Sequence, residues 1–203
     1  MIVYVESNFL LEIARRQEEA PQAEAILRYS EARKIRLVLP AFSICEPFST
    51  LTYSGSYRSR FADDMLKQLQ DLRRLEPHKQ LAEDLEPLRK VLLSLEHSEM
   101  NALEAVTARM LKTVELIHIT APLFAKARNF EGRFDLTPQD AIVFASVEDH
   151  LVRQPPNIPK CFASRDKDFN DPSLAGRLKR ANCRHIAPFK NALNFIKNTI
   201  RSA

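Results

Sequence analysis

Four acidic residues stand where a sheet-forming chain would gather ligands. Glu6 and Asp166 each follow a short apolar run, and Glu46 and Asp140 lie near the expected starts of helices among apolar neighbours. Four carboxylates in one cleft repel each other and raise each other's pKa unless a cation neutralises them. A set of oxygen ligands without Cys or His suits Mg²⁺ or Mn²⁺ better than zinc. The pattern therefore predicts a site for a hard divalent metal ion.

The elements that must position these acids alternate between strand and helix. Apolar runs rich in β-formers predict strands, and apolar residues at helical spacing predict helices. The alternation implies a parallel sheet with right-handed crossovers, and ligands collect beyond the carboxyl ends of such strands. We predict an α/β fold with strands over 2–5, 35–39, 159–163 and 184–186. The predicted helices cover about 9–14, 21–34, 42–53, 138–151 and 189–200.

Two of the acids also fit helix caps. Asp140 lies three residues after Thr137 with Pro138 between them, which is the pattern of an N-cap, a first-turn proline and an N3 acid. Ser43 and Glu46 fit a capping box, although Pro47 follows directly and weakens that reading. Capping and metal binding therefore both remain open for these two residues.

The other two acids have structural alternatives as well. Glu6 could be a surface residue ahead of a Ser7 cap, and Asp166 could form a turn in the sequence Arg-Asp-Lys-Asp. Each acid taken alone has an ordinary explanation. Convergence of all four on one sheet edge is what favours a shared metal site.

The middle of the chain interrupts the alternation, because residues 60–115 contain no strand candidate. Phe61, Met65, Leu69 and Leu72 recur at helical spacing, and so do leucines between residues 81 and 95. These stripes predict a helical pair that packs on itself or on the sheet. Pro87 either starts the second helix or kinks it. We interpret the chain as a single domain, 1–203, with a helical insertion at about 60–115.

Charge is distributed unevenly along the 203 residues. The net charge is +4, but residues 151–203 carry 11 Lys and Arg against 3 acids, whereas residues 1–150 carry a net −4. A basic end attracts a polyanion. A solvated basic surface is the ordinary alternative.

Several functional classes are unsupported. Cys45, Cys161 and Cys183 are far apart, which argues against a disulfide framework or a zinc knuckle and favours a cytoplasmic location. No apolar stretch is long enough for a membrane span, and the N-terminus lacks the pattern of a signal peptide. The glycines are too sparse for a nucleotide-binding loop, and the five histidines form no metal motif, so we expect ordinary core or surface roles for them.

Four blocks of the sequence resemble the PIN domain family of metal-dependent nucleases, which includes the VapC-like toxins of bacterial toxin-antitoxin pairs. Their order and spacing match the family, and they comprise residues 3–11, 39–46, 140–146 and 164–169. The resemblance implies a three-layer α/β/α fold that binds one or two Mg²⁺ or Mn²⁺ ions and cleaves phosphodiesters, usually in RNA. It also implies RNA as substrate and an antitoxin protein as a further expected partner. The leucine spacing of residues 60–115 leads to a separate hypothesis, that the insertion shapes substrate access or self-association into a homodimer.

The resemblance also implies roles for individual residues. Glu6, Glu46, Asp140 and Asp166 would be the catalytic metal ligands, with Asp168 as a reserve ligand. Asn8 and Ser164 would order the acids through hydrogen bonds. The expected phosphate contacts are Arg165, Lys167, Arg177, Lys179 and Arg180.

One position departs from the family pattern. Glu6 stands where the family usually has Asp, and the extra methylene moves the carboxylate by about 1.5 Å. Mg²⁺ demands strict octahedral geometry. The sequence therefore leaves open a second function, that of a catalytically attenuated PIN scaffold which binds RNA or a protein partner.

Overall fold

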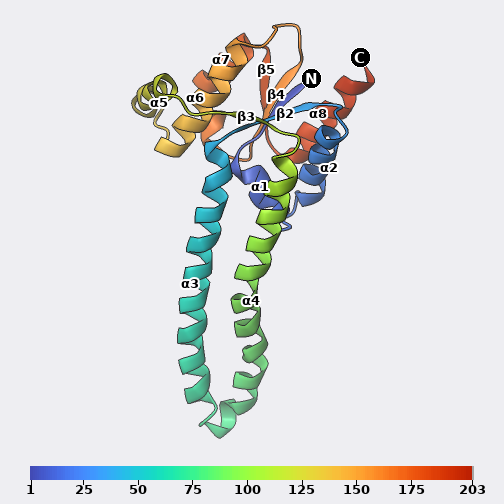
Figure 1. Cartoon of the computed structure of the whole chain (residues 1–203). Coiled ribbons are helices and arrows are strands. Elements are labelled where there is room, and N and C mark those ends of the chain that lie inside the picture. Colours follow the sequence, from blue (N-terminus) through green and yellow to red (C-terminus); the bar gives the residue numbers. More distant parts are fainter. Residues whose placement is uncertain (203) are drawn as a thin grey trace. The chain divides into compact units, whose positions relative to one another are not determined.

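A computed structural model describes residues 1–202 and contains a five-stranded sheet in the order β3-β2-β1-β4-β5 (Figure 1). All four neighbouring pairs are parallel, and β1 is central, so that Ile2 lies opposite both Arg36 and Lys160. The carboxyl ends of all five strands therefore share one edge of the sheet. The strands are β1 (Ile2–Tyr4), β2 (Arg36–Pro40), β3 (Glu115–Ile117), β4 (Lys160–Ala163) and β5 (Cys183–Ile186).

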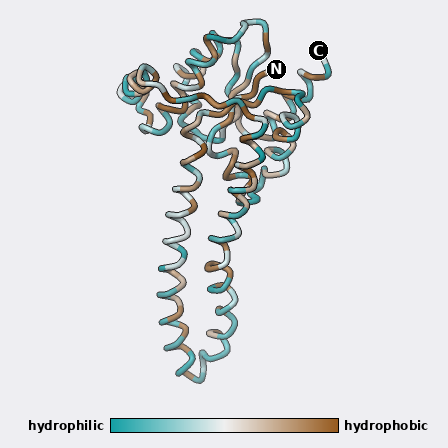
Figure 2. Tube along the Cα trace, in the orientation of Figure 1, coloured by the Kyte–Doolittle hydropathy of each residue, from teal (hydrophilic) through white to brown (hydrophobic). Residues whose placement is uncertain are grey.

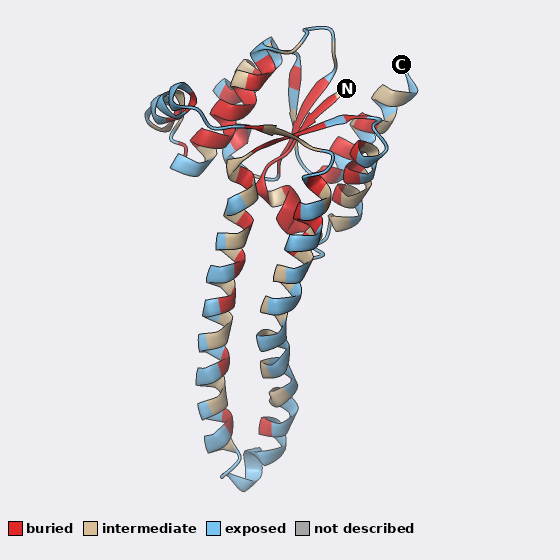
Figure 3. Cartoon of the chain, viewed as in Figure 1, coloured by how far each residue is buried: buried red, intermediate tan, exposed pale blue. Residues whose placement is uncertain are grey.

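Helices cover both faces of this sheet, which makes the fold a three-layer α/β/α sandwich. On one face, α5 (Ala121–Phe134), α6 (Pro138–Val152) and α7 (Pro172–Arg180) enclose an apolar core with the side chains of β1 and β4. On the other face, α2 (Ala20–Glu31) packs against α1 (Ser7–Ala14) and α8 (Phe189–Arg201). The three inner strands β1, β2 and β4 are almost completely buried, as is most of α6 (Figure 3). The predicted α/β fold with a central parallel sheet is thus confirmed.

Aromatic rings fill the core on both faces. Phe162 of β4 lies 5.0 Å from the ring of Phe169, and on the opposite face the rings of Phe9 and Phe189 are 5.5 Å apart. Both histidines that enter this core have ordinary packing roles. Nδ1 of the buried His150 and the Tyr4 hydroxyl share a hydrogen bond of 2.8 Å. His185 packs beside the ring of Phe162.

Sequence analysis missed one strand, β3, and it also named no helix over α5 or α7. Strand β3 has only three residues, Glu115–Ile117, and the sequence of these residues does not alternate between apolar and polar. Its strand conformation depends on pairing with β2, where Leu116 lies opposite Leu39. A strand defined by its neighbour rather than by its own composition leaves little trace in the sequence.

The chain divides into two compact units, of which the first comprises residues 1–47 together with those from Leu103 onward, and the second comprises residues 48–102. The second unit is a helical hairpin formed by most of α3 (Phe42–Leu72) and α4 (Lys79–Met110), with the short 3₁₀ helix η1 (Glu76–His78) at its tip. Figure 2 shows hydrophobic stretches interspersed with hydrophilic ones along both of its helices. The helix predicted over 42–53 therefore continues without a break to Leu72.

The buried line of α3 differs from the predicted stripe. Leu51, Gly55, Ala62 and Leu69 are buried in the hairpin, whereas Phe61 is 53% exposed. Small residues on this line let the partner helix approach closely, since a Cβ on Gly55 would lie 2.4 Å from Cδ of Glu96. Contact with α4 is thus partly polar, which a search for large apolar residues does not detect.

The second predicted stripe also faces solvent in part. Leu81 and Leu88 are each 49% exposed, while Ala82 is fully buried. Pro87 lies inside α4, so the alternative in which it starts a helix is wrong.

Candidate metal centre

Glu6 lies directly after β1 and is the N-cap of α1. Its Oε2 accepts hydrogen bonds from the Ser7 hydroxyl and the Asn8 backbone N–H, both at 2.8 Å, and its Oε1 accepts one from the Ser164 hydroxyl at 3.0 Å. The side chain is buried, with 3% exposure, so the alternative of a surface residue is wrong. The cap is Glu6 itself rather than Ser7.

Burial controls the protonation of Glu6. It raises the pKa of this carboxyl from 4.5 to about 7, although the hydrogen bonds from Asn8, Ser7 and Ser164 act in the opposite direction. The negative charge of Glu46 raises this pKa further. A positive charge at this position would favour the ionised form.

Asp140 lies in the first turn of α6, where the predicted cap is present. Thr137 is the N-cap and accepts the Asp140 backbone N–H at 3.2 Å, and its hydroxyl donates to Oδ2 of Asp140. Burial raises the pKa of Asp140, and so do the charges of Asp166, Asp168 and Glu46. Asp140 therefore takes part in the helix cap and still interacts electrostatically with the other acids.

Asp166 lies in the loop that follows β4. Its backbone N–H donates to the Ser164 hydroxyl at 3.0 Å, and its Oδ1 accepts the backbone N–H of Asp168 at 2.9 Å. This is the turn predicted from the local sequence. Because the Ser164 hydroxyl also donates to Glu6, one side chain connects the ends of β1 and β4.

Glu46 is in the second turn of α3, where no capping box forms. The helix begins at Phe42, so Glu46 is beyond the N3 position, and the Ser43 hydroxyl is buried without a hydrogen-bond partner among residues 1–202. The capping alternative for Glu46 is therefore wrong. Its charge acts instead on Glu6 and Asp140.

The acids thus share an electrostatic field but do not form a closed set of ligands. Within residues 1–202, no three carboxylate, thiol or imidazole groups lie close enough to hold a metal ion as they stand. Three of the acids are engaged locally: Glu6 with two serines, Asp140 with Thr137, and Asp166 with its own turn. Carboxylate oxygens are the ligands that a hard cation prefers. A divalent ion would also neutralise the repulsion between the carboxylates.

The five predicted phosphate contacts differ in how far their charges are compensated. Arg165 forms an ion pair with Glu12 and lies 4.0 Å from Glu19, and Arg177 pairs with Glu148. Lys167, Lys179 and Arg180 are exposed, and none of the described residues forms an ion pair with them. The three exposed cations are the stronger candidates for contact with a polyanion.

Sequence analysis did not single out Glu12. It is buried in α1 with 1% exposure, pairs with Arg165 and accepts the Glu19 backbone N–H at 2.6 Å. The sequence shows only an acid within a helix, and its partner is 153 residues away. No local signal could have identified this pair.

Helices long and apolar enough to cross a membrane do not occur in the described part of the chain. Comparison with curated proteins and with solved structures gave no match. Residues 3–169, which include all five candidate acids and the whole hairpin, match the family model described as PIN domain. PIN domains are generally nucleases, and they typically use divalent metal ions. With the parallel sheet and the acids at its carboxyl edge, this match shows that the chain belongs to the PIN domain family.

Proposed function

We propose that this protein is a ribonuclease that depends on Mg²⁺ or Mn²⁺ and hydrolyses phosphodiester bonds in RNA. The observation that carries the proposal is the shared field of the acids. Burial is the largest cause of the raised pKa of Asp140 and of Glu6; the charges of Asp166, Asp168 and Glu46 raise the pKa of Asp140 further, and that of Glu46 raises the pKa of Glu6. Titratable groups that perturb each other in this way are typical of functional sites.

Four acids would hold the metal: Glu6, Glu46, Asp140 and Asp166, with Asp168 as a further oxygen donor. A bound divalent ion supplies a coordinated water of lowered pKa and a positive charge for the leaving oxygen. Ser164 fixes the distance between Glu6 and the Asp166 backbone through its two hydrogen bonds. The Asn8 backbone N–H holds Oε2 of Glu6 in place.

The substrate backbone would contact the exposed cations Lys167, Lys179 and Arg180. Contacts of this kind position a nucleic acid without reading its sequence. In the toxin form of this proposal, an antitoxin protein would bind and inhibit the chain. Expression of the chain with and without the product of a neighbouring small gene would test that form, with growth arrest relieved by co-expression as the expected result.

The test of the nuclease is cleavage of a mixed RNA pool with Mn²⁺. We expect wild-type cleavage that is abolished by EDTA and by Asp140→Asn, because the amide keeps the size of the side chain and an acceptor for Thr137 but removes the negative charge. The matched control is Asp63→Asn, since Asp63 is an exposed acid of the hairpin. Wild-type cleavage by the Asp140→Asn variant would show that the acids are not the site.

A second function is favoured by the surroundings of Glu6. Both carboxylate oxygens of Glu6 already accept hydrogen bonds from the protein, and the side chain is longer than the family's usual Asp. These features suit an attenuated scaffold that binds RNA or a protein partner without cutting. RNA binding without Mn²⁺-dependent cleavage by the wild type, together with faster cleavage by Glu6→Asp, would support this alternative.

A further inference from the structure

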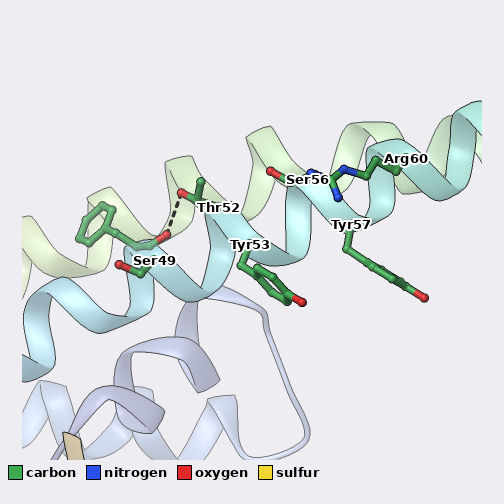
Figure 4. A pocket seen from close by; sticks show the side chains of 7 residues that line it. Ser49, Thr52, Tyr53, Ser56, Tyr57 and Arg60 are labelled. Carbon is green, nitrogen blue, oxygen red and sulfur yellow. Dashed lines mark hydrogen bonds between the residues drawn. The ribbon is translucent and has the colours of Figure 1, made fainter. Parts of the chain in front are cut away.

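The hairpin carries an aromatic surface that contributes nothing to its own packing. Phe48, Ser49, Thr52, Tyr53, Ser56, Tyr57 and Arg60, all on α3, line a hollow of about 550 Å³; we call them the tyrosine face (Figure 4). Tyr53 is 77% exposed and Tyr57 is 67% exposed. Figure 4 shows both rings projecting from the same side of the helix.

These rings are not required to hold the hairpin together. The buried line of α3 runs through Leu51, Gly55 and Ala62, and the tyrosines lie off that line. Large exposed rings gathered on one surface are typical of binding sites, because a surface without a ligand gains nothing from them. The tyrosine face is therefore a candidate binding surface.

Charge indicates what the occupant is. Residues 48–62 contain Arg58 and Arg60 but no acid, whereas residues 63–102 carry nine acids and six Lys and Arg. Arg58 pairs with Glu99 at 2.5 Å, while Arg60 forms no ion pair within residues 1–202. An unpaired guanidinium that lines the same hollow as the aromatic rings complements a phosphate group. A second copy of the same face would instead place arginine against arginine.

The spacing of the rings suits single-stranded nucleic acid. Residues four apart on a helix are separated by about 6 Å along its axis, which places Tyr53 and Tyr57 one turn apart. Bases stack on such rings in single strands, whereas a duplex keeps its bases covered. Ser49 and Ser56 add hydroxyls that can bond phosphate or ribose oxygens.

We propose that the tyrosine face binds a single-stranded segment of RNA by stacking bases on Tyr53 and Tyr57 and pairing a phosphate with Arg60. The proposal deepens the proposed function and rests on RNA being its substrate class. The same helix contains Glu46, seven residues before Tyr53 in the sequence. One helix thus carries both a proposed metal ligand and the proposed contacts to the substrate.

The experiment measures binding separately from cleavage. The full chain in EDTA is titrated into a fluorescein-labelled single-stranded oligoribonucleotide of mixed sequence, and the anisotropy is followed. We expect Tyr53→Ala and Tyr57→Ala each to weaken binding about tenfold, and Tyr57→Phe to stay within about twofold because the ring remains. The matched control is Leu88→Ala, an exposed apolar residue on the other helix of the hairpin, which should not change the affinity.

Each outcome separates this inference from the proposed function. Equal binding by the two alanine variants and the wild type overturns the inference, as does equal affinity for a fully paired RNA duplex. A fall in molecular mass on light scattering for Tyr53→Ala, with RNA affinity retained, identifies the face as a protein interface and also overturns it. Tyrosine-dependent binding without Mn²⁺-dependent cleavage overturns only the nuclease.

Discussion

At the scale of single residues, hydrogen bonds from the protein hold the carboxylates of the candidate site in position. Glu6 has three donors and full burial, Asp140 has a helix cap, and Asp166 has a turn. The sequence predicted the cap and the turn correctly because both are local patterns. It could not predict the hydrogen bond from Ser164 to Glu6, because the two residues are 158 positions apart in the sequence.

The raised pKa of Glu6 predicts a specific pH dependence of stability. Between about pH 4.5 and pH 7 the folded chain keeps a proton that the unfolded chain releases, so the free energy of unfolding falls as the pH rises through this window. The full effect is about 3 kcal/mol. Glu6→Gln lacks this titration.

Urea unfolding in EDTA at pH 4.5 and pH 7.5 measures the difference. We expect the stability of Glu6→Gln relative to wild type to improve by up to about 3 kcal/mol at the higher pH. A relative stability that does not change with pH would mean that folding leaves the pKa of Glu6 at its ordinary value.

Ser164 gives a second prediction at this scale. Ser164→Ala removes the donor to Glu6 and leaves the Asp166 backbone N–H without its acceptor, so we expect a loss of about 1–3 kcal/mol and a clear drop in Mn²⁺-dependent cleavage. Thermal unfolding and the RNA cleavage assay measure the two effects. Ser173→Ala, at an exposed serine, should change neither, and equal behaviour of the two variants would contradict the bridging role.

At the scale of elements, sequence periodicity predicted most strands and helices. The rest depend on contacts with neighbouring elements, as the pairing of β3 with β2 shows. Strands β1, β2 and β4 contain apolar runs of their own, whereas β3 pairs with β2 and β5 (Cys183–Ile186) includes Arg184 and His185. The line of α3 that faces α4 includes Gly55 and Arg58, which no hydrophobic pattern would select. The hairpin was thus predictable as helical, but not which of its faces would be buried.

Gly55 and Glu96 provide a double-mutant test of this packing. A Cβ at position 55 would lie 2.4 Å from Cδ of Glu96, while alanine in a helix is more stable than glycine by about 0.5–1 kcal/mol. In the Glu96→Ala background, Gly55→Ala should therefore stabilise the chain by about that amount. In the wild-type background the gain should be smaller because Glu96 must move. Equal gains in urea unfolding of both backgrounds would contradict a close approach of these residues.

At the scale of the whole molecule, basic charge is concentrated in residues 151–203, but ion pairs divide it into compensated and free cations. Each phosphate contact to single-stranded RNA contributes about 0.7 to the slope of log affinity against log salt. Lys179→Gln and Arg180→Gln should each lower that slope by about this amount. Arg109→Gln is the matched control, because Glu24 and Glu31 already pair with that guanidinium.

Anisotropy titrations of labelled single-stranded RNA between low and moderate salt give the slopes. Unchanged slopes for both test variants would place the RNA backbone away from α7. A lowered slope for Arg109→Gln would show that an arginine already in ion pairs with Glu24 and Glu31 still contributes to RNA binding.

The central position of β1 has a consequence for biosynthesis. Its two neighbours come from residues 36–38 and 160–162, and Ser164 and Asp166 follow the second of these. A nascent chain that stops before Lys160 lacks one side of its central strand and the loop that completes the acids. All five candidate acids are therefore present together only after about four fifths of the polypeptide has been synthesised.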